Sequence, residues 1–220
     1  MKHRIGLLAI PAFVVAAAAF VAAPALAATT FTISPGGAWS GSGSGGGIRD
    51  AVSNQVTHCS SSAVAGSFKS GKGLSGTNIG ALTSIALTGC QVHGVAVTIT
   101  VHTSTANPAP MSLTGEFPAG SATFTGQATN ISLTLDDANG CHAEVGAKTI
   151  NGGGPGVAGF TYNSTGAQLS FAAGIHGLFV QSATPQCSSG AYHGLAVKQF
   201  DRIDLDAAAI ISPAQTISSP

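Results

Sequence analysis

The sequence predicts an all-β protein, an antiparallel β-sandwich or barrel that is held by two disulfides. Three observations predict this fold class. Apolar and polar residues alternate along many short segments, turn-forming residues separate these segments, and four cysteines follow an N-terminal export signal. No segment shows the sustained 3.6-residue apolar period that predicts a long helix.

The clearest predicted strand covers residues 95–102. Its alternation places Val95, Val97, Ile99 and Val101 on one face and Ala96, Thr98, Thr100 and His102 on the other. Shorter runs of the same kind pair Phe31 with Ile33, Ile131 with Leu133 and Leu135, Phe160 with Tyr162, Leu169 with Phe171, and Ile203 with Leu205. β-Branched and aromatic residues fill these runs, as the half-buried face of a sheet favours.

Turn chemistry separates the runs. Asn139-Gly140 favours the positive φ values of a tight hairpin turn, and residues 162–169 have the pattern of a hairpin with a Gly-containing loop. The Gly/Ser run at 41–47 predicts a flexible segment by its composition. The three alanines at 207–209 fit either a short helical turn or the end of a terminal strand.

Residues 1–27 have the pattern of a secretory signal peptide. Basic residues precede an apolar stretch at 5–21, and Ala25-Leu26-Ala27 is a small-x-small site for signal peptidase. The alternative is a membrane anchor, which needs about 20 unbroken apolar residues. Pro11 and Pro24 argue against that alternative.

The remaining residues, 28–220, are predicted to form a single secreted β domain. Removal of the signal peptide leaves six basic and eight acidic residues, for a formal charge of −2. No basic cluster is present to meet a phosphate backbone, so the sequence predicts no nucleic-acid partner. Hydrophobic residues make up 44% of the chain and charged residues only 7%, the reverse of a disordered composition.

All four cysteines lie in the predicted secreted domain, and an even number in an exported chain predicts disulfides. Four cysteines allow three pairings. We favour Cys59–Cys90 and Cys141–Cys187, because sequential pairing keeps each bridge within one half of the chain. No Cys-x-x-Cys spacing points to a redox or zinc site, so the cysteines are interpreted as structural.

Two groups of residues are candidates for metal binding, and neither has the pattern of a strong site. His58 and His142 adjoin cysteines, but disulfides would consume the thiolates that zinc needs. Asp204 and Asp206 would point to the same face of a strand and could hold calcium. The alternative for this pair is a solvated face helped by the neighbouring Arg202.

The sequence contains no recognisable catalytic constellation. The serine-hydrolase pattern Gly-x-Ser-x-Gly is absent, and no Gly-rich stretch has the context of a phosphate-binding loop. A hydrolase that uses scattered carboxylates, such as Glu116, Glu144 or the aspartates, stays an alternative that depends on the fold. No catalytic residue and no cofactor is therefore predicted.

Alternating Ser/Thr and aliphatic strands also describe a membrane-inserting or pore-forming β protein. Low charge favours this alternative. The composition argues against it, because aromatic residues are only 6% and such proteins carry aromatic girdles at both membrane interfaces.

Several short motifs give the chain a resemblance to a known group. They are residues 31–37 (FTISPGG), 59–62 (CSSS), 66–76 (GSFKSGKGLSG), 162–165 (YNST) and 212–220 (SPAQTISSP). With the signal peptide, they make the chain resemble small secreted actinobacterial proteins of unknown function, over most of the mature chain. The resemblance implies an exported envelope or culture-fluid protein and carries over no catalytic residue. We therefore expect a non-enzymatic secreted or cell-surface protein with an extracellular or cell-wall ligand.

Overall fold

The structure is a computed structural model that describes residues 30–148, 154–188 and 194–219. The predicted signal peptide, residues 1–27, lies outside the described residues. The described part is nearly all antiparallel β-structure, as the sequence predicts, with one short helix. Both predicted disulfides, Cys59–Cys90 and Cys141–Cys187, are present.

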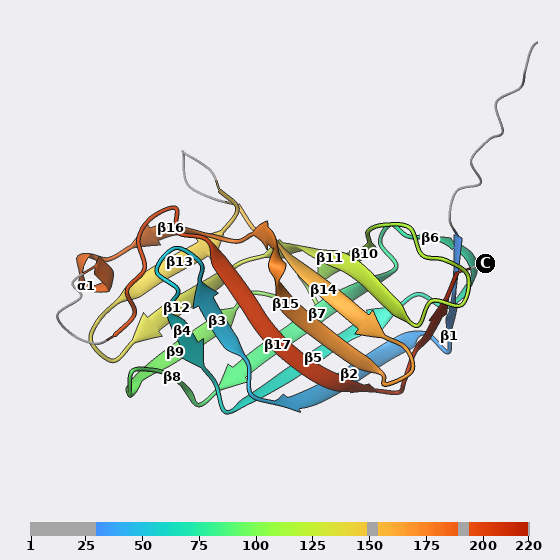
Figure 1. Cartoon of the computed structure of the whole chain (residues 1–220), viewed down its shortest axis with the longest axis horizontal. Helices are drawn as coiled ribbons and strands as arrows, with labels where there is room; N and C mark the ends of the chain where they lie inside the picture. The colour runs from blue at the N-terminus through green and yellow to red at the C-terminus, as the bar shows by residue number, and fades with distance from the viewer. Residues whose placement is uncertain (1–29, 149–153, 189–193, 220) are drawn as a thin grey trace, which may run out of the picture.

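The main body is an elongated barrel of long strands, most of them divided into two segments (Figure 1). One wall contains β2 (Gly37–Ser44) with β3 (Gly47–Asp50), β4 (Val56–His58) with β5 (Ser61–Phe68), β7 (Gly80–Thr88) with β8 (Cys90–Val92), and β17 (Ile203–Ser212). The other wall contains β9 (Val95–Val101) with β10 (Ala109–Leu113), β11 (Thr123–Ile131) with β12 (Leu133–Asp137), β13 (His142–Gly146) with β14 (Gly156–Asn163), and β15 (Gln168–Gly177) with β16 (Phe179–Ala183).

These eight long strands follow one another around the barrel in the order of the chain. Each divided strand pairs with the next through both of its segments, as β2 and β3 do with β5 and β4. The barrel closes where β17 pairs with β2 and β3 on one side and with β15 on the other. An isolated bridge between Phe179 and Arg202 continues this closure next to β16. The topology is therefore an up-and-down antiparallel barrel rather than a sandwich.

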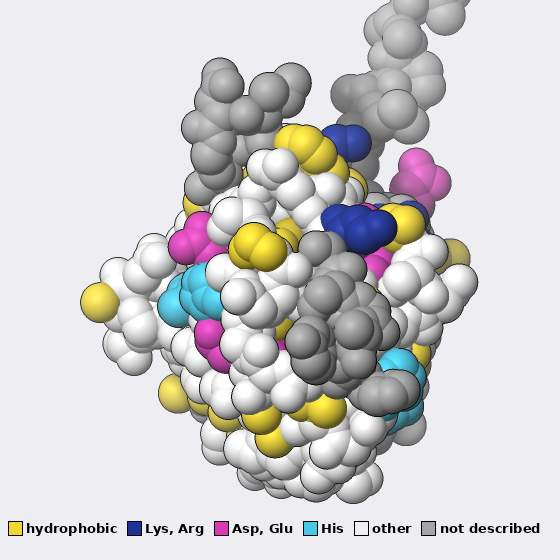
Figure 2. All heavy atoms as spheres, turned by 90° about the vertical axis from the view of Figure 1, so that its left-hand side faces the viewer, with side chains coloured by type: hydrophobic (Ala, Val, Ile, Leu, Met, Phe, Trp, Pro, Cys, Tyr) yellow, Lys and Arg dark blue, Asp and Glu magenta, His cyan; other side chains and the backbone are white. Residues whose placement is uncertain are grey.

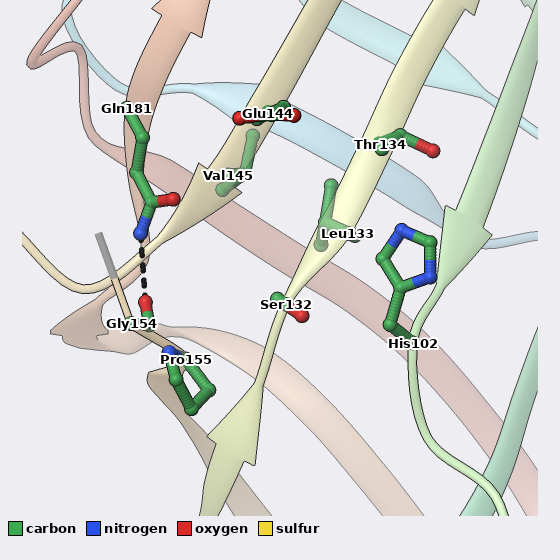
Figure 3. A pocket seen from close by; sticks show the side chains of 9 residues that line it. All are labelled: His102, Ser132, Leu133, Thr134, Glu144, Val145, Gly154, Pro155 and Gln181. Atoms are coloured by element: carbon green, nitrogen blue, oxygen red, sulfur yellow. Dashed lines mark hydrogen bonds between the residues drawn. The ribbon is translucent and has the colours of Figure 1, made fainter. Parts of the chain in front are cut away.

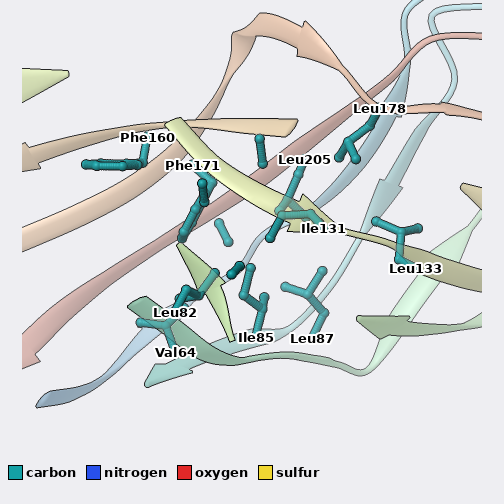
Figure 4. Packing of buried hydrophobic residues seen from close by; sticks show 14 of the residues in the cluster. Val64, Leu82, Ile85, Leu87, Ile131, Leu133, Phe160, Phe171, Leu178 and Leu205 are labelled. Atoms are coloured by element: carbon teal, nitrogen blue, oxygen red, sulfur yellow. The ribbon is translucent and has the colours of Figure 1, made fainter. Parts of the chain in front are cut away.

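Apolar side chains of the two walls meet in the barrel interior. Val64, Ile85 and Leu87 of one wall face residues such as Leu133 and Phe171 of the other (Figure 4). The runs predicted from alternation are buried on the expected face: Phe31, Ile33, Val97, Ile99, Ile131, Leu133, Leu135, Phe160, Tyr162, Leu169, Phe171, Ile203 and Leu205. The period-2 pattern therefore identifies most of the core.

A three-stranded sheet covers one end of the barrel, at the right of Figure 1. It contains β1 (Thr30–Ser34), β6 (Gly71–Ser75) and β18 (Thr216–Ser218), with β1 in the middle. Phe31 packs edge-on against Phe124, whose centroid is 6.3 Å away. The buried hydroxyl of Tyr162 donates to the carbonyl of Gln215 at 2.6 Å and accepts from its N–H at 3.0 Å. These contacts attach the end sheet to the barrel.

The opposite end is covered by the connection between β16 and β17. This connection begins with α1 (Pro185–Ser188), which the Cys141–Cys187 disulfide ties to the start of β13. The Asp137 carboxylate accepts from the N–H groups of Asn139, Cys141 and Leu195 at 2.8–2.9 Å. Asp137 thus shapes the turn after β12 and also holds the segment that covers this end of the barrel.

The prediction of a flexible segment at 41–47 is wrong for most of these residues, because they lie in β-strands. Residues 41–44 end β2 and Gly47 begins β3. The glycines serve close packing here, because a Cβ on Gly43 would lie 1.8 Å from the carbonyl oxygen of Ala208. The three alanines at 207–209 lie within β17, so the strand alternative is the observed one.

Both hairpins predicted from turn chemistry are observed. Gly140, at φ +90°, lies in the turn between β12 and β13. Asn163 pairs with Gln168 at the end of the β14–β15 hairpin. The Asn163 side-chain oxygen accepts from the N–H groups of Thr165 and Gly166, which explains how this loop is closed.

Candidate functional site

An open groove crosses the outside of the second wall at the level where its strands are divided. Its volume is about 210 Å³. Its lining comes from β9, β12, β13 and β16 and the segments next to them: His102, Ser132, Leu133, Thr134, Glu144, Val145, Gly154, Pro155 and Gln181 (Figure 3). We call this feature the mid-barrel groove.

The groove lies where two long strands of this wall are divided. One strand leaves the wall after β9 and returns at β10, and the other is divided between the end of β13 at Gly146 and the start of β14 at Gly156. The His102 N–H still donates to the Ser132 carbonyl at 2.7 Å, so the first departure begins at His102. Asn130, at φ +65°, donates from its side chain to Asn107 at 2.9 Å and fixes that excursion to the wall.

The second flank is fixed by Gln181. Its side-chain nitrogen donates to the carbonyl of Gly154 at 2.7 Å and to that of Ala147 at 3.2 Å. Gln181 lies at a register shift, because Ser182 pairs with Glu144 but Val180 pairs with Val145. Such a β-bulge re-aims a side chain, and here it brings Gln181 to the groove. Figure 3 shows its amide oxygen pointing away from Gly154, toward the strand that carries Val145.

Hydroxyl groups and one carboxylate complete the groove. Thr134 pairs with Glu144 across β12 and β13, so both side chains are on the outer face. Glu144 accepts from the Ser182 hydroxyl through one carboxylate oxygen, Oε2, at 3.1 Å. Glu144 is the one Asp, Glu, Lys or Arg side chain in the lining. The side of the groove that carries Glu144 and Gln181 is therefore negative. The other side presents the hydroxyls of Ser132 and Thr134 and the ring of His102.

A His–Asp pair lies two register positions farther along the same two strands, on the same face. His142 Nδ1 lies 2.6 Å from the Asp136 carboxylate, and both side chains are about half exposed. The hydrogen bond that Asp136 accepts from the His142 ring raises the pKa of His142, with smaller contributions from the charges of Asp136 and Glu144. Asp136 stands shortly before the predicted Asn139-Gly140 turn. Alternation alone could have placed it on the same face as Thr134, but not its pairing with His142.

The sequence-predicted pair Asp204 and Asp206 lies elsewhere, on β17. Both line a second hollow of about 190 Å³, which also contains His58 and Arg49. Asp206 is exposed, whereas the Asp204 side chain is only 4% exposed, with the Arg202 Nε 3.5 Å away. The solvated face expected for this pair is therefore observed for Asp206 alone.

No set of three or more His, Cys, Asp or Glu side chains in the described ranges has the arrangement of a metal site. Asp204 and Asp206 therefore lack a third ligand of these types within the described residues. His58 and His142 adjoin cysteines that the disulfides occupy, as expected from the sequence. The other carboxylates offered for a hydrolase lie on different elements, Glu144 on β13 and Glu116 in the connection between β10 and β11.

The end of the barrel that carries α1 is shown in Figure 2. Most of its surface is uncharged, and histidine side chains lie beside acidic ones on one flank. Within the described ranges, no helix has the length and hydropathy of a membrane span. The two disulfides indicate an oxidising, extracellular type of environment.

Comparisons with known proteins found no match: no family model, no curated protein and no solved structure is significantly similar to the chain.

Proposed function

We propose that the chain is a non-enzymatic secreted or cell-surface protein that binds a component of the cell envelope. The observation that carries the proposal is the contrast between a filled interior and an open polar groove on the outer wall. Large side chains such as Tyr162, Phe124 and Phe171 fill the interior. Within the described residues, the interior therefore leaves no room for a ligand. The polar side chains of the mid-barrel groove offer a binding site on the outside of the barrel.

Three of the carboxylates, those of Asp50, Asp137 and Asp201, support binding rather than catalysis, because their oxygens hold loops. Asp50 accepts from the Val52 N–H and the Ser53 hydroxyl at 2.8 and 2.6 Å. Asp201 accepts from the Lys198 N–H at 2.7 Å. Asp137 does the same for three backbone groups. A carboxylate that holds the backbone in this way serves poorly as a nucleophile or proton donor.

Sedimentation with washed cell walls tests this proposal. The oxidised protein without residues 1–27 is mixed with insoluble walls of the producing organism, and a secreted β protein of similar net charge is the control. We expect the protein, and not the control, to sediment and to resist elution by salt. A protein that stays in the supernatant at all wall concentrations contradicts the envelope role.

A hydrolase is the second candidate, and the His142–Asp136 pair is the observation that favours it. A carboxylate on Nδ1 orients an imidazole so that Nε2 can take a proton, which is the arrangement of a general base. This candidate predicts that any hydrolytic activity on envelope polymers is lost in His142→Gln. Activity that survives this substitution contradicts the role of the pair.

A membrane-inserting role is supported less well by the outer face. Outward positions of the long strands hold Ser, Thr and Ala, such as Ser42, Ala63 and Thr100. Among the described residues, the exposed large apolar side chains are Val52, Val56, Phe200 and Ile210. Insertion would require the apolar faces to turn outward. Leakage of dye from liposomes over a wide protein range would be the sign of this alternative.

A further inference from the structure

We propose that the mid-barrel groove binds a small hydroxylated ligand that carries a primary ammonium group, of which an amino sugar is the simplest example. This inference rests on the proposed binding role and specifies its ligand. It is carried by the division of the groove into an acceptor side and a hydroxyl side.

The acceptor side is defined by Gln181 and Glu144. The Gln181 amide nitrogen donates two hydrogen bonds to backbone carbonyls, at Ala147 and Gly154, so the orientation of the amide is fixed. Its oxygen is then the atom presented to the groove (Figure 3). One Glu144 oxygen accepts from Ser182, and the second oxygen can accept from a ligand. This side is therefore suited to a charged hydrogen-bond donor.

The charges around the groove favour a cation. Glu144 supplies a negative charge in the lining. The charge of neighbouring Asp136 is compensated when His142 is protonated. Lys148 lies over the ring of Phe179, 5.4 Å from its centroid, and is not part of the lining. An ammonium ion beside Glu144 would restore the local balance of charge.

The hydroxyl side and the size of the groove limit the rest of the ligand. Ser132, Thr134 and His102 can each exchange hydrogen bonds with hydroxyl groups. Pro155 is exposed and adds apolar surface, against which the face of a sugar ring can pack, whereas the Leu133 and Val145 side chains are buried in the barrel interior. A volume of about 210 Å³ is below the usual range for drug-sized ligands and fits one small ring.

A glucosamine titration followed by ¹H–¹⁵N NMR tests this inference on the oxidised protein. Glucose and N-acetylglucosamine are the matched probes, because neither carries a cationic amine. We expect glucosamine alone to shift the backbone amides of Ser132, Thr134, Glu144 and Gln181 in a saturable way. Equal shifts with all three sugars, or no shift with glucosamine, overturn the inference.

Substitution of Glu144 tests whether its carboxylate is the partner of the ligand's ammonium group. Glu144→Gln keeps an acceptor for Ser182 but removes the charge, and we expect it to weaken glucosamine binding at least about tenfold. Glu116→Gln, at an exposed carboxylate in the connection between β10 and β11, is the control and should bind as the native protein does. Unchanged affinity in Glu144→Gln, with the remaining spectrum intact, overturns the assignment.

The two proposals can fail separately. Wall binding without glucosamine binding overturns the ligand inference and leaves the envelope role. Glucosamine binding without wall binding overturns the envelope role. A soluble glucosamine oligomer that binds more tightly than the monomer supports the inference and identifies a polymer chain, rather than a free sugar, as the source of the amine.

Discussion

At the residue scale, single polar side chains link elements of the fold, one pair on the outer face of the barrel and one at its end. Asp136 and His142 lie opposite each other on β12 and β13, where a register of one-to-one pairing brings them within 2.6 Å. Tyr162, by contrast, is fully buried and reaches from β14 to the backbone of Gln215. Both contacts give predictions that single substitutions can test.

The His142–Asp136 pair predicts a pH dependence. The ion pair raises the folded-state pKa of His142 above 6.5. Its stabilising contribution is therefore complete below pH 6.5 and is lost as the pH rises through the raised pKa. An NMR titration should give a pKa above 6.5 for His142, and Asp136→Asn should lower it. A pKa that is the same with and without Asp136 would show that the pair does not form in solution.

Tyr162→Phe should destabilise the protein by about 1–3 kcal/mol, because it leaves the buried N–H and carbonyl of Gln215 without their partner. Burial also raises the pKa of the Tyr162 phenol, so it should stay protonated in the folded protein above pH 10. Urea unfolding measures the first effect. The control is Ser84→Ala on the exposed face of β7, which should change stability by less than about 0.5 kcal/mol. Equal losses in the two variants would contradict the account of Tyr162.

At the scale of elements, the glycines of β2 show why composition alone does not distinguish a flexible linker from a closely packed strand. A Gly/Ser run has the composition of a flexible linker, and nothing in the run itself shows what packs on it. In the fold, β2 lies between β5 and β17, and carbonyl oxygens of β17 occupy the space where side chains on Gly41 and Gly43 would be. The need for glycine at these positions comes from β17, a strand more than 150 residues later in the chain.

Gly43→Ala should therefore be strongly destabilising. The new Cβ would lie 1.8 Å from the carbonyl oxygen of Ala208, so the backbone of β2 or β17 has to shift. Overpacking of this kind costs about 1–3 kcal/mol or more. Gly166→Ala is the matched control, because its Cβ would meet no atom closer than 4.0 Å. Thermal unfolding of both variants measures the difference, and similar melting temperatures would contradict the packing of β2 against β17.

The disulfides act between elements. Cys59 lies between β4 and β5 and Cys90 begins β8, so their bridge joins two long strands where each is divided. Cys59→Ala with Cys90→Ala should lower stability by about 2–5 kcal/mol, because the bridge restricts a segment of 31 residues in the unfolded chain. Denaturant unfolding with and without the bridge measures this loss. An unchanged midpoint would show that the unfolded state is not restricted by it.

Much of the element-scale structure could be predicted from local sequence. Alternation placed Val97, Ile99, Leu133 and Leu135 in the core, and Asn139-Gly140 marked a hairpin. The mid-barrel groove could not be predicted. It depends on a bulge at Gln181 and on the division of the two long strands that flank β11 and β12, which are features of pairing between distant segments rather than of any one segment.

At the scale of the whole molecule, the described residues form an up-and-down barrel with both ends covered. One end is covered by the sheet that contains β1 and β18, near the beginning and end of the described chain. The other end is covered by the segment that follows β16 and begins with α1. Closure pairs β17 with β2 and β3, so the first and last long strands meet. The mid-barrel groove lies on the outside of this barrel.

The most direct test of the extracellular account is the mass of the protein from each compartment. The full-length chain is expressed in a Gram-positive host, and the intact mass from medium, wall and membrane is measured before and after reduction and thiol alkylation. We predict a species in the medium or wall that lacks residues 1–27 and takes up four alkyl groups only after reduction. An uncleaved species with free thiols, recovered only with detergent, would contradict the account.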